Sequence, residues 1–291
     1  MDEANSTYHF ILKVVTTSLY QFVSVFGFIL IFGLLLYFLS RSTRKAFSNS
    51  GHDKLDVFFT GWIGTPVHEI GHAVFCILFG HRITDIKLYS PNSQDGTLGY
   101  VNHSFNSKSF YQRIGNFFIG TGPILFGSFV LYLLIWFCLP NYRLISEIIS
   151  KTELTGSGVF DLMKNTGKML STGLNLLMNV FSPENFGKLS FWLFIYLAFC
   201  ISSHMQLSPA DLRSMFSGIF TILLLFLLVN FTTMLLGFNI TEYILKFSRL
   251  TGSMINIFIL ATGISFINFL ATYLILASFH YKTQRRLLSI W

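Results

Sequence analysis

The segment TPVHEIGHA, residues 65–73, carries the side chains that are most able to do chemistry in this sequence. His68 and His72 are four positions apart, so on a helix both rings project from one face and can hold one metal ion. Glu69 stands beside the first histidine, where a carboxylate can take a proton from the water that such a metal activates. The spacing therefore predicts the centre of a metal-dependent hydrolase with Glu69 as its catalytic base.

Two histidines leave this predicted site incomplete, because a catalytic zinc ion usually has three protein ligands and one open position. Cys76 lies on the same helical face, but it is about 12 Å along the axis from His68 and cannot share the ion with it. The third ligand must come from elsewhere in the chain, and the candidates are Asp85, Asp95, His204 and Asp211.

Asp211 has two interpretations of equal weight from its sequence context. It can be the third metal ligand, or it can be the acid in the first turn of a helix that begins with capping Ser208 and Pro209. His204 is a rival for the ligand role, although a lone histidine in an apolar helix can also be a hydrogen-bonded group at a helix interface. The residues alone leave these alternatives open.

The chain around these residues is strongly apolar. Of its 291 residues, 52% are hydrophobic and only 11% are charged, with a mean hydropathy of +0.59, whereas soluble domains carry about 25% charged residues. Segments long enough to span a bilayer occupy residues 14–40, 56–80, 114–142, 189–210, 214–241 and 250–281. The predicted fold class is an all-α polytopic membrane protein with about six transmembrane helices, of which residues 56–80 carry the motif.

Two local patterns refine this fold. Thr65 and Pro66 predict that the motif helix starts just before its histidines, with threonine as the cap and proline at the first helical position. Segments 83–90 and 97–103 are rich in β-branched and aromatic residues and flank the turn sequence PNSQDG. They predict a membrane-associated β-hairpin after the motif helix, with a plain extramembrane loop as the alternative.

The net charge of +7 does not indicate a nucleic-acid partner, because no basic stripe is interleaved with aromatic residues. The basic residues instead flank the first and last apolar segments, a position that suits anionic lipid headgroups. They are Arg41, Arg44 and Lys45, and Lys282, Arg285 and Arg286. The expected location is a multi-pass position in a bilayer, and the absence of organelle-targeting signals favours a bacterial inner membrane.

Three segments, in this order, resemble the site-2 proteases, which are zinc metalloproteases that cut substrates within the membrane. HEIGHA at 68–73 matches the zinc-binding motif, and GTGPILFG at 120–127 is similar to the family's glycine-proline motif. HMQLSPAD at 204–211 is similar to the segment where a family asparagine precedes prolines and a metal-binding aspartate. The resemblance covers about residues 56–215.

The resemblance implies a role for each matching residue. His68, His72 and Asp211 correspond to the three ligands of one zinc ion per chain, and Glu69 corresponds to the catalytic glutamate. His204 stands where the family has asparagine, which implies a contact with the substrate or with the tetrahedral intermediate.

Other features either extend the resemblance or depart from it. The hairpin at 83–103 corresponds to the family's membrane-dipping β element. The family's aspartate-glycine pair is Asp211-Leu212 here, and no PDZ-type peptide-binding domain is visible, so the chain is similar to a PDZ-less member. An exposed strand could hold an extended substrate by pairing with it. The residues expected to do so are Leu98, Gly99, Tyr100 and Val101.

The expected organisation has three parts. Residues 1–55 form an accessory transmembrane helix and a basic loop, residues 56–215 form the metalloprotease core, and residues 216–291 form two transmembrane helices and a basic tail. Within the core, we expect the motif helix, the hairpin at 83–103, a second helix at 113–139, a loop at 140–188 and a third helix at 189–212. In that loop, the apolar stretch 169–181 suits a short helix at the membrane interface or on the bundle.

The expected function is a zinc-dependent intramembrane endopeptidase whose partners are a transmembrane protein or peptide substrate and the lipid bilayer. One alternative keeps the zinc and changes the substrate to a lipid-linked or other non-peptide amide. A second alternative is a non-enzymatic membrane scaffold or carrier, which should string further ionisable groups across its other helices.

Overall fold

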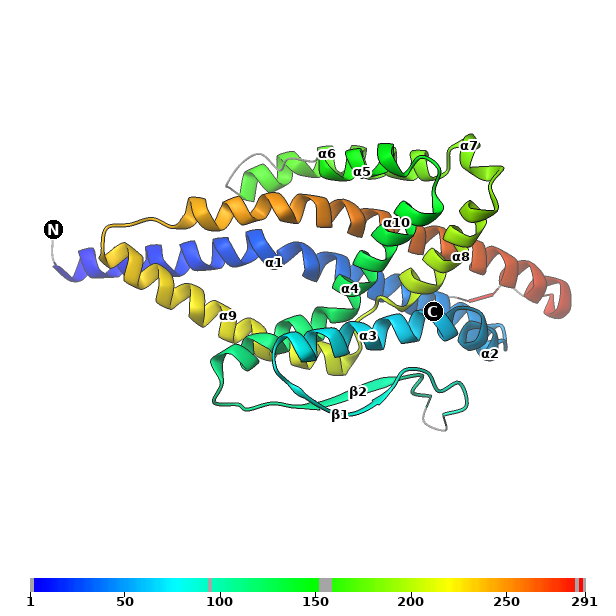
Figure 1. The fold of residues 1–291 in the computed structure, drawn as a ribbon, viewed down its shortest axis with the longest axis horizontal. Helices are drawn as coiled ribbons and strands as arrows, with labels where there is room; N and C mark the ends of the chain where they lie inside the picture. Colours follow the sequence, from blue (N-terminus) through cyan, green and yellow to red (C-terminus); the bar gives the residue numbers. More distant parts are fainter. Residues whose placement is uncertain (1–2, 94–95, 152–158, 286–287, 290–291) are drawn as a thin grey trace.

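The computed structural model describes residues 3–93, 96–151, 159–285 and 288–289, and helices dominate this part of the chain (Figure 1). The elements are α1 (Glu3–Asn49), α2 (Asp53–Asp56), the π-helical turn η1 (Val57–Gly61), α3 (Trp62–Leu78), β1 (Arg82–Lys87), β2 (Tyr100–Ser104), α4 (Phe110–Cys138), α5 (Tyr142–Ser150), α6 (Val159–Val180), α7 (Pro183–Phe186), α8 (Leu189–His204), α9 (Pro209–Leu235) and α10 (Thr241–Gln284).

Four helices of the described part are long and apolar enough to cross a membrane. They are Asn5–Asn49, Phe110–Cys138, Pro209–Leu235 and Ser253–Thr283. Helix α8 has 16 residues, which at 1.5 Å per residue reach roughly 24 Å, short of the ~30 Å hydrocarbon core. Helix α3 has 17 residues but continues α2 and η1 without a break. The expected count of six spans therefore remains a prediction.

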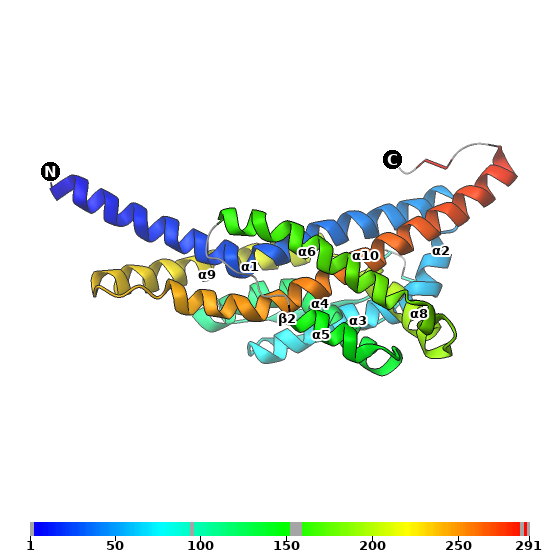
Figure 2. The same cartoon turned by 90° about the horizontal axis from the view of Figure 1, so that it is seen from above.

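Helix α4 lies at the centre of the bundle, where it packs on α3, α8 and α9. Helix α1 packs on α9 and α10, and the view from above shows these long helices lying roughly along the long axis of the molecule (Figure 2). The shared core is filled by large side chains that are fully buried, among them Phe117, Phe191, Phe194 and Phe258.

Polar side chains inside the bundle connect the apolar helices. Asn230 of α9 donates to Ser18 Oγ at 3.0 Å and to Gln21 Oε1 at 2.7 Å, both on α1. Ser40 of α1 donates to the carbonyl of Ser203 on α8 at 2.7 Å. Such bonds satisfy polar groups that lipid cannot, and they tie α1 to the helices that carry the predicted site.

Helices α3 and α4 approach backbone to backbone at the second half of the motif. A Cβ on Gly71 would lie 2.8 Å from the carbonyl oxygen of Gly122, and a Cβ on Gly122 would lie 2.8 Å from that of Gly71. Only glycine at both positions allows this crossing, which fixes His72 beside α4.

The predicted start of the motif helix at Thr65 is wrong. The chain is already helical through α2 and η1, and Pro66 is the fifth residue of α3. A proline within a helix removes one N–H and crowds the carbonyl four residues back. A π-helical turn, Val57–Gly61, precedes α3 directly.

Two other expected boundaries are also wrong. The expected helix at 189–212 ends at His204, and α9 starts at Pro209, because proline disfavours the helical conformation of the preceding residue. The expected loop at 140–188 contains α5, α6 and α7 in its described part. The stretch 169–181 lies within α6 or just after it, and it packs on the bundle against α10, with Leu176 and Val180 fully buried.

The second core helix and the hairpin lie where the sequence places them. Helix α4 covers 110–138, close to the expected 113–139. Strands β1 and β2 are antiparallel, with a register from Arg82↔Ser104 to Lys87↔Tyr100 and a shift between Ile83 and Asp85. The hairpin lies along α3 (Figure 1). Of the expected basic tail, Arg286 lies outside the described residues.

Replacing Gly71 by alanine tests the α3–α4 crossing. The added methyl group meets backbone atoms that cannot rotate away, so we expect Gly71→Ala to lower stability by about 1–3 kcal/mol, measured by thermal unfolding in detergent. The matched control is Gly187→Ala, where a Cβ meets nothing within 4 Å. Equal unfolding temperatures for the two variants would contradict the close crossing.

Candidate metal centre

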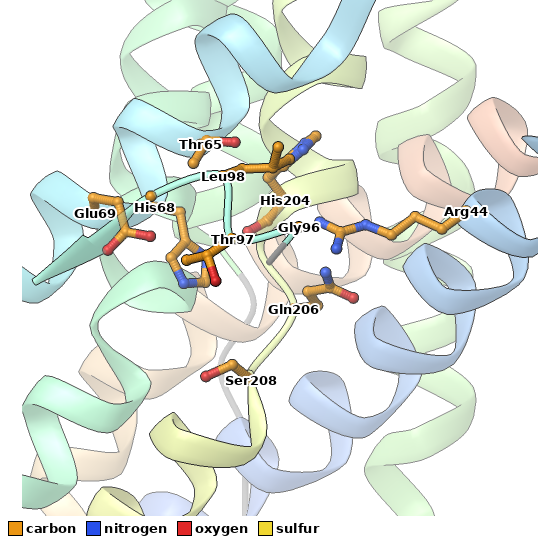
Figure 3. Close-up of a pocket in the computed structure, with 11 residues that line it drawn as sticks. Arg44, Thr65, His68, Glu69, Gly96, Thr97, Leu98, His204, Gln206 and Ser208 are labelled. Carbon is orange, nitrogen blue, oxygen red and sulfur yellow. Dashed lines mark hydrogen bonds between the residues drawn. The ribbon is translucent and has the colours of Figure 1, made fainter. Parts of the chain in front are cut away.

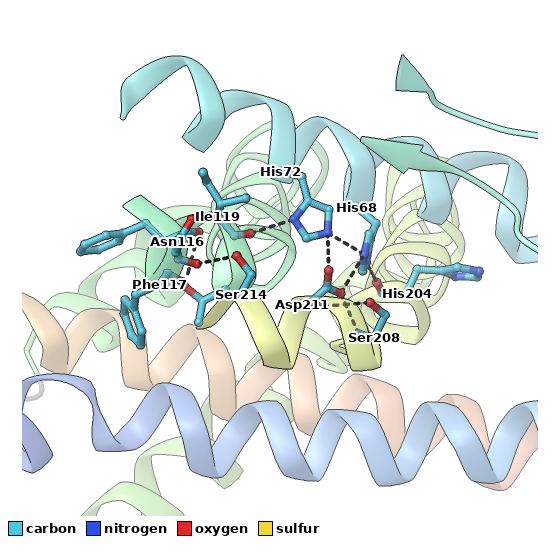
Figure 4. A network of polar contacts seen from close by, with 11 residues as sticks. His68, His72, Asn116, Phe117, Ile119, His204, Ser208, Asp211 and Ser214 are labelled. Carbon is cyan, nitrogen blue, oxygen red and sulfur yellow. Dashed lines mark hydrogen bonds and ion pairs between the residues drawn. The ribbon is translucent and has the colours of Figure 1, made fainter. Parts of the chain in front are cut away.

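Three side chains from two helices converge at the N-terminal end of α9. His72 Nε2 lies 3.2 Å from His68 Nε2 and 3.1 Å from Asp211 Oδ1, and His68 Nε2 lies 3.7 Å from Asp211 Oδ2 (Figure 4). Each of these side chains is at most 14% exposed. This group could hold a metal ion.

Backbone carbonyls fix both imidazole rings. His68 Nδ1 lies 2.7 Å from the carbonyl oxygen of His204, and His72 Nδ1 lies 2.7 Å from that of Ile119. A carbonyl oxygen only accepts hydrogen bonds, so both Nδ1 atoms must carry the proton. In neutral rings, both Nε2 atoms then carry lone pairs. Two imidazole lone pairs and a carboxylate then point at one small volume, which is an arrangement that could hold a metal ion.

Asp211 is at once the third residue of a helix capping box and a member of this group. Its backbone N–H donates to Ser208 Oγ at 3.2 Å, and its Oδ2 accepts from the N–H of Ser208 at 2.6 Å, which is a complete capping box. Its Oδ1 faces His72. The cap holds the carboxylate in the orientation that the metal group requires, so the two interpretations of this residue do not exclude each other.

Glu69 lies beside this group and is only 6% exposed. It lines a cavity of about 190 Å³ together with His68, Arg44 and Gln206 (Figure 3). It also lines a larger cavity of about 530 Å³ with His68, His72 and Asp211. A water or a substrate in the larger cavity would face the carboxylate and the three metal donors together.

The strand expected to hold substrate borders both cavities. Leu98 and Gly99 line the smaller one, and Gly99, Tyr100 and Val101 line the larger one. A Cβ on Gly99 would lie 2.8 Å from Glu69 Cγ, so glycine lets this segment lie directly on the motif helix. In the described part of the chain β2 pairs only with β1, which leaves its second edge open.

The ring of His204 points away from the three donors (Figure 4). The ring is buried, and its Nδ1 lies 3.1 Å from the carbonyl oxygen of Cys200 and 3.1 Å from Ser203 Oγ. The structure therefore brings the backbone carbonyl of His204, rather than its ring, to the three donors, while His204 also lines the smaller cavity with His68 and Glu69. Asp85 is exposed and accepts from Tyr100 Oη at 2.7 Å, and Asp95 lies outside the described residues.

Sequence reasoning missed several groups around the site. The carbonyl oxygens of Ile119 and His204 leave no signal in a sequence, because every residue has one. Arg44 was assigned only to lipid, yet it lines the smaller cavity. With the Gln206 amide oxygen turned toward it, Arg44 donates from Nη2 at 2.8 Å and from Nη1 at 3.1 Å.

No family model, curated protein or solved structure matches this chain. The argument for function therefore starts from the geometry of the site.

Replacing Asp211 by asparagine separates its two roles. Asparagine still caps a helix but carries no charge, so we expect Asp211→Asn to weaken metal binding by at least about tenfold while the metal-free protein keeps its stability. Ser208→Ala is the matched variant, and it should lose about 1 kcal/mol of stability and keep its metal. Metal titration measures the metal affinity of each variant, and thermal unfolding with and without chelator measures its stability. Full metal affinity in Asp211→Asn would show that this residue is only a cap.

Proposed function

We propose that this protein is a zinc-dependent intramembrane endopeptidase that hydrolyses peptide bonds of membrane-embedded substrates. The observation that carries the proposal is the convergence of two imidazole lone pairs and a carboxylate beside Glu69, in a cavity bordered by an open strand edge. The resemblance of the three sequence segments to the site-2 proteases supports the same conclusion.

Zinc fits the donor set. Two zinc–ligand bonds of ~2.0–2.1 Å at a tetrahedral angle place their donor atoms roughly 3.3–3.4 Å apart. The two Nε2 atoms are 3.2 Å apart and His72 Nε2 is 3.1 Å from Asp211 Oδ1, both close to this value, while His68 Nε2 lies 3.7 Å from the other carboxylate oxygen, Oδ2. Three protein ligands also leave one position open, which is the pattern of a catalytic rather than a structural zinc site.

Each residue of the proposed site has its own role in hydrolysis. His68, His72 and Asp211 would hold the zinc, which when bound acts as a Lewis acid and makes water acidic enough to lose a proton near neutral pH. Glu69 takes that proton as the water oxygen adds to the peptide carbonyl carbon. It then delivers the proton to the leaving nitrogen as the C–N bond breaks.

The substrate must be extended at the site. A helix hides its carbonyls in hydrogen bonds to residue i+4, so a transmembrane substrate has to unwind before its peptide bond can react. The open edge of β2 offers main-chain hydrogen bonds to such an extended segment, next to Glu69 and the donors. Residues 98–101 are the proposed substrate strand.

The position of the site supports a substrate within the membrane. The three donors are buried in a bundle whose α1, α4, α9 and α10 contain the candidate spans. Ionisable groups are costly in hydrocarbon and are kept there mainly for function. We place the protein in a bilayer as a multi-pass protein, with a bacterial inner membrane as the proposed location.

Replacing Glu69 by glutamine tests the proposed chemistry. Glutamine keeps the size of the side chain but cannot take a proton, so we expect Glu69→Gln to lower kcat by roughly 10²- to 10⁴-fold with unchanged zinc content. The assay uses a panel of quenched-fluorescent peptides with a transmembrane segment, in detergent micelles. The matched control is Glu184→Gln, at an exposed acid on α7.

Full cleavage by Glu69→Gln would refute this mechanism. If the wild type cleaves N-acyl lipid amides and none of the peptides, the site belongs to an amidase rather than to a protease.

A further inference from the structure

A second pair of histidines lies beside the metal group. His103 is on β2 and lines the cavity of about 530 Å³ together with Glu69 and the three donors. His81 follows α3, and its backbone N–H donates to the carbonyl of Cys76 at 2.8 Å. Neither residue is part of the metal group among the described residues.

A chain of hydrogen bonds fixes the protons of this pair. His81 Nε2 lies 2.8 Å from the carbonyl oxygen of Gln112, so Nε2 must carry the proton. In the neutral ring, His81 Nδ1 then has a lone pair, and it lies 3.1 Å from His103 Nδ1. His81 Nδ1 therefore accepts a hydrogen bond from the Nδ1–H of His103. The lone pair of neutral His103 is therefore on Nε2, which has no hydrogen-bond partner in the described part of the chain.

The surroundings of both rings favour this neutral state and these tautomers. His81 is only 6% exposed and stacks on Phe105 with centroids 5.0 Å apart. Burial lowers the pKa of both histidines, and for His103 the neighbouring His81 and His72 lower the pKa further. Near neutral pH, His103 thus presents an unprotonated Nε2 on a fixed ring.

We propose that His103 is a catalytic residue on the leaving-group side, where its Nε2 accepts a hydrogen bond from the N–H of the scissile peptide nitrogen. This inference rests on the proposed peptidase function. His81 is the positioning residue that fixes the tautomer of His103.

The proposed contact favours the transition state over the bound substrate. In the substrate, the peptide N–H is neutral. When Glu69 delivers its proton and the C–N bond breaks, the same nitrogen becomes an amine that gains positive charge. A hydrogen bond from a charged donor is about twice as strong as one from a neutral donor. The bond to His103 Nε2 therefore strengthens during the reaction, which is the condition for raising kcat.

His103 thus takes part in the chemistry from a position that His204 does not reach. The sequence resemblance placed a transition-state contact at His204, but that ring is buried and faces away from the donors. His103 instead lines the cavity that contains Glu69 and all three donors.

The test compares His103→Asn, His103→Gln and the wild type in the peptide assay. Asparagine is too short to reach the position of Nε2, so we expect kcat to fall by roughly 10- to 100-fold, with KM and zinc content unchanged. Glutamine can place its Oε1 acceptor near that position and should restore much of kcat. The matched control is His9→Asn, at an exposed histidine of α1, which should behave as the wild type.

Three results would overturn this role for His103. One is a wild-type kcat in His103→Asn. Another is a rise in KM alone, which would mean that His103 only binds substrate. The third is a joint loss of zinc and activity in both His103 variants, which would mean that the residue supports the metal site. Failure of the proposed function is distinct, because the wild type itself would then lack zinc or peptidase activity.

Discussion

The hydrogen bonds from two imidazole Nδ1 atoms to backbone carbonyls are the interactions on which the proposed site depends. They give His68 and His72 one tautomer each and turn both Nε2 lone pairs toward Asp211. The carbonyls belong to the end of α8 and to α4, so the site is correct only when three helices are packed correctly on one another. The close crossing at Gly71 and Gly122 holds α3 against α4, and the capping box at Ser208 orients the Asp211 carboxylate. Both features support the same arrangement of side chains.

The bundle combines long candidate spans with shorter helices, and the candidate site lies where they meet, with His68 and His72 on α3 and Asp211 on α9. Helix α8 does not reach across a typical hydrocarbon core by its length, while α1, α4, α9 and α10 contain segments that do. In the described part of the chain, the hairpin and the segment between α8 and α9 border the cavities at the site. Non-helical backbone is tolerated at membrane depth where it lines a polar cavity, so this architecture can bring water and an extended peptide to one place.

Local patterns in the sequence predicted the parts of the site that depend on spacing. The i, i+4 histidines and Glu69 follow from one helix, and the hairpin follows from its turn chemistry and its β-branched strands. The sequence could not separate a capping role from a ligand role for Asp211, because one carboxylate can fill both. The helix boundary at 204–209, the helices within 140–188 and the direction of the His204 ring depend on tertiary packing. The carbonyl partners of the histidines and the His81–His103 pair depend on contacts between distant segments, which no single segment encodes.

The most direct test of the central claim is X-ray absorption at the zinc edge on detergent-purified wild-type protein. We expect stoichiometric zinc with a first shell of nitrogen and oxygen at about 2.0–2.1 Å, and imidazole scattering from two histidines. A preparation that takes up no zinc after supplementation would contradict the account. So would a shell that contains sulfur at about 2.3 Å, because the three proposed ligands offer only nitrogen and oxygen.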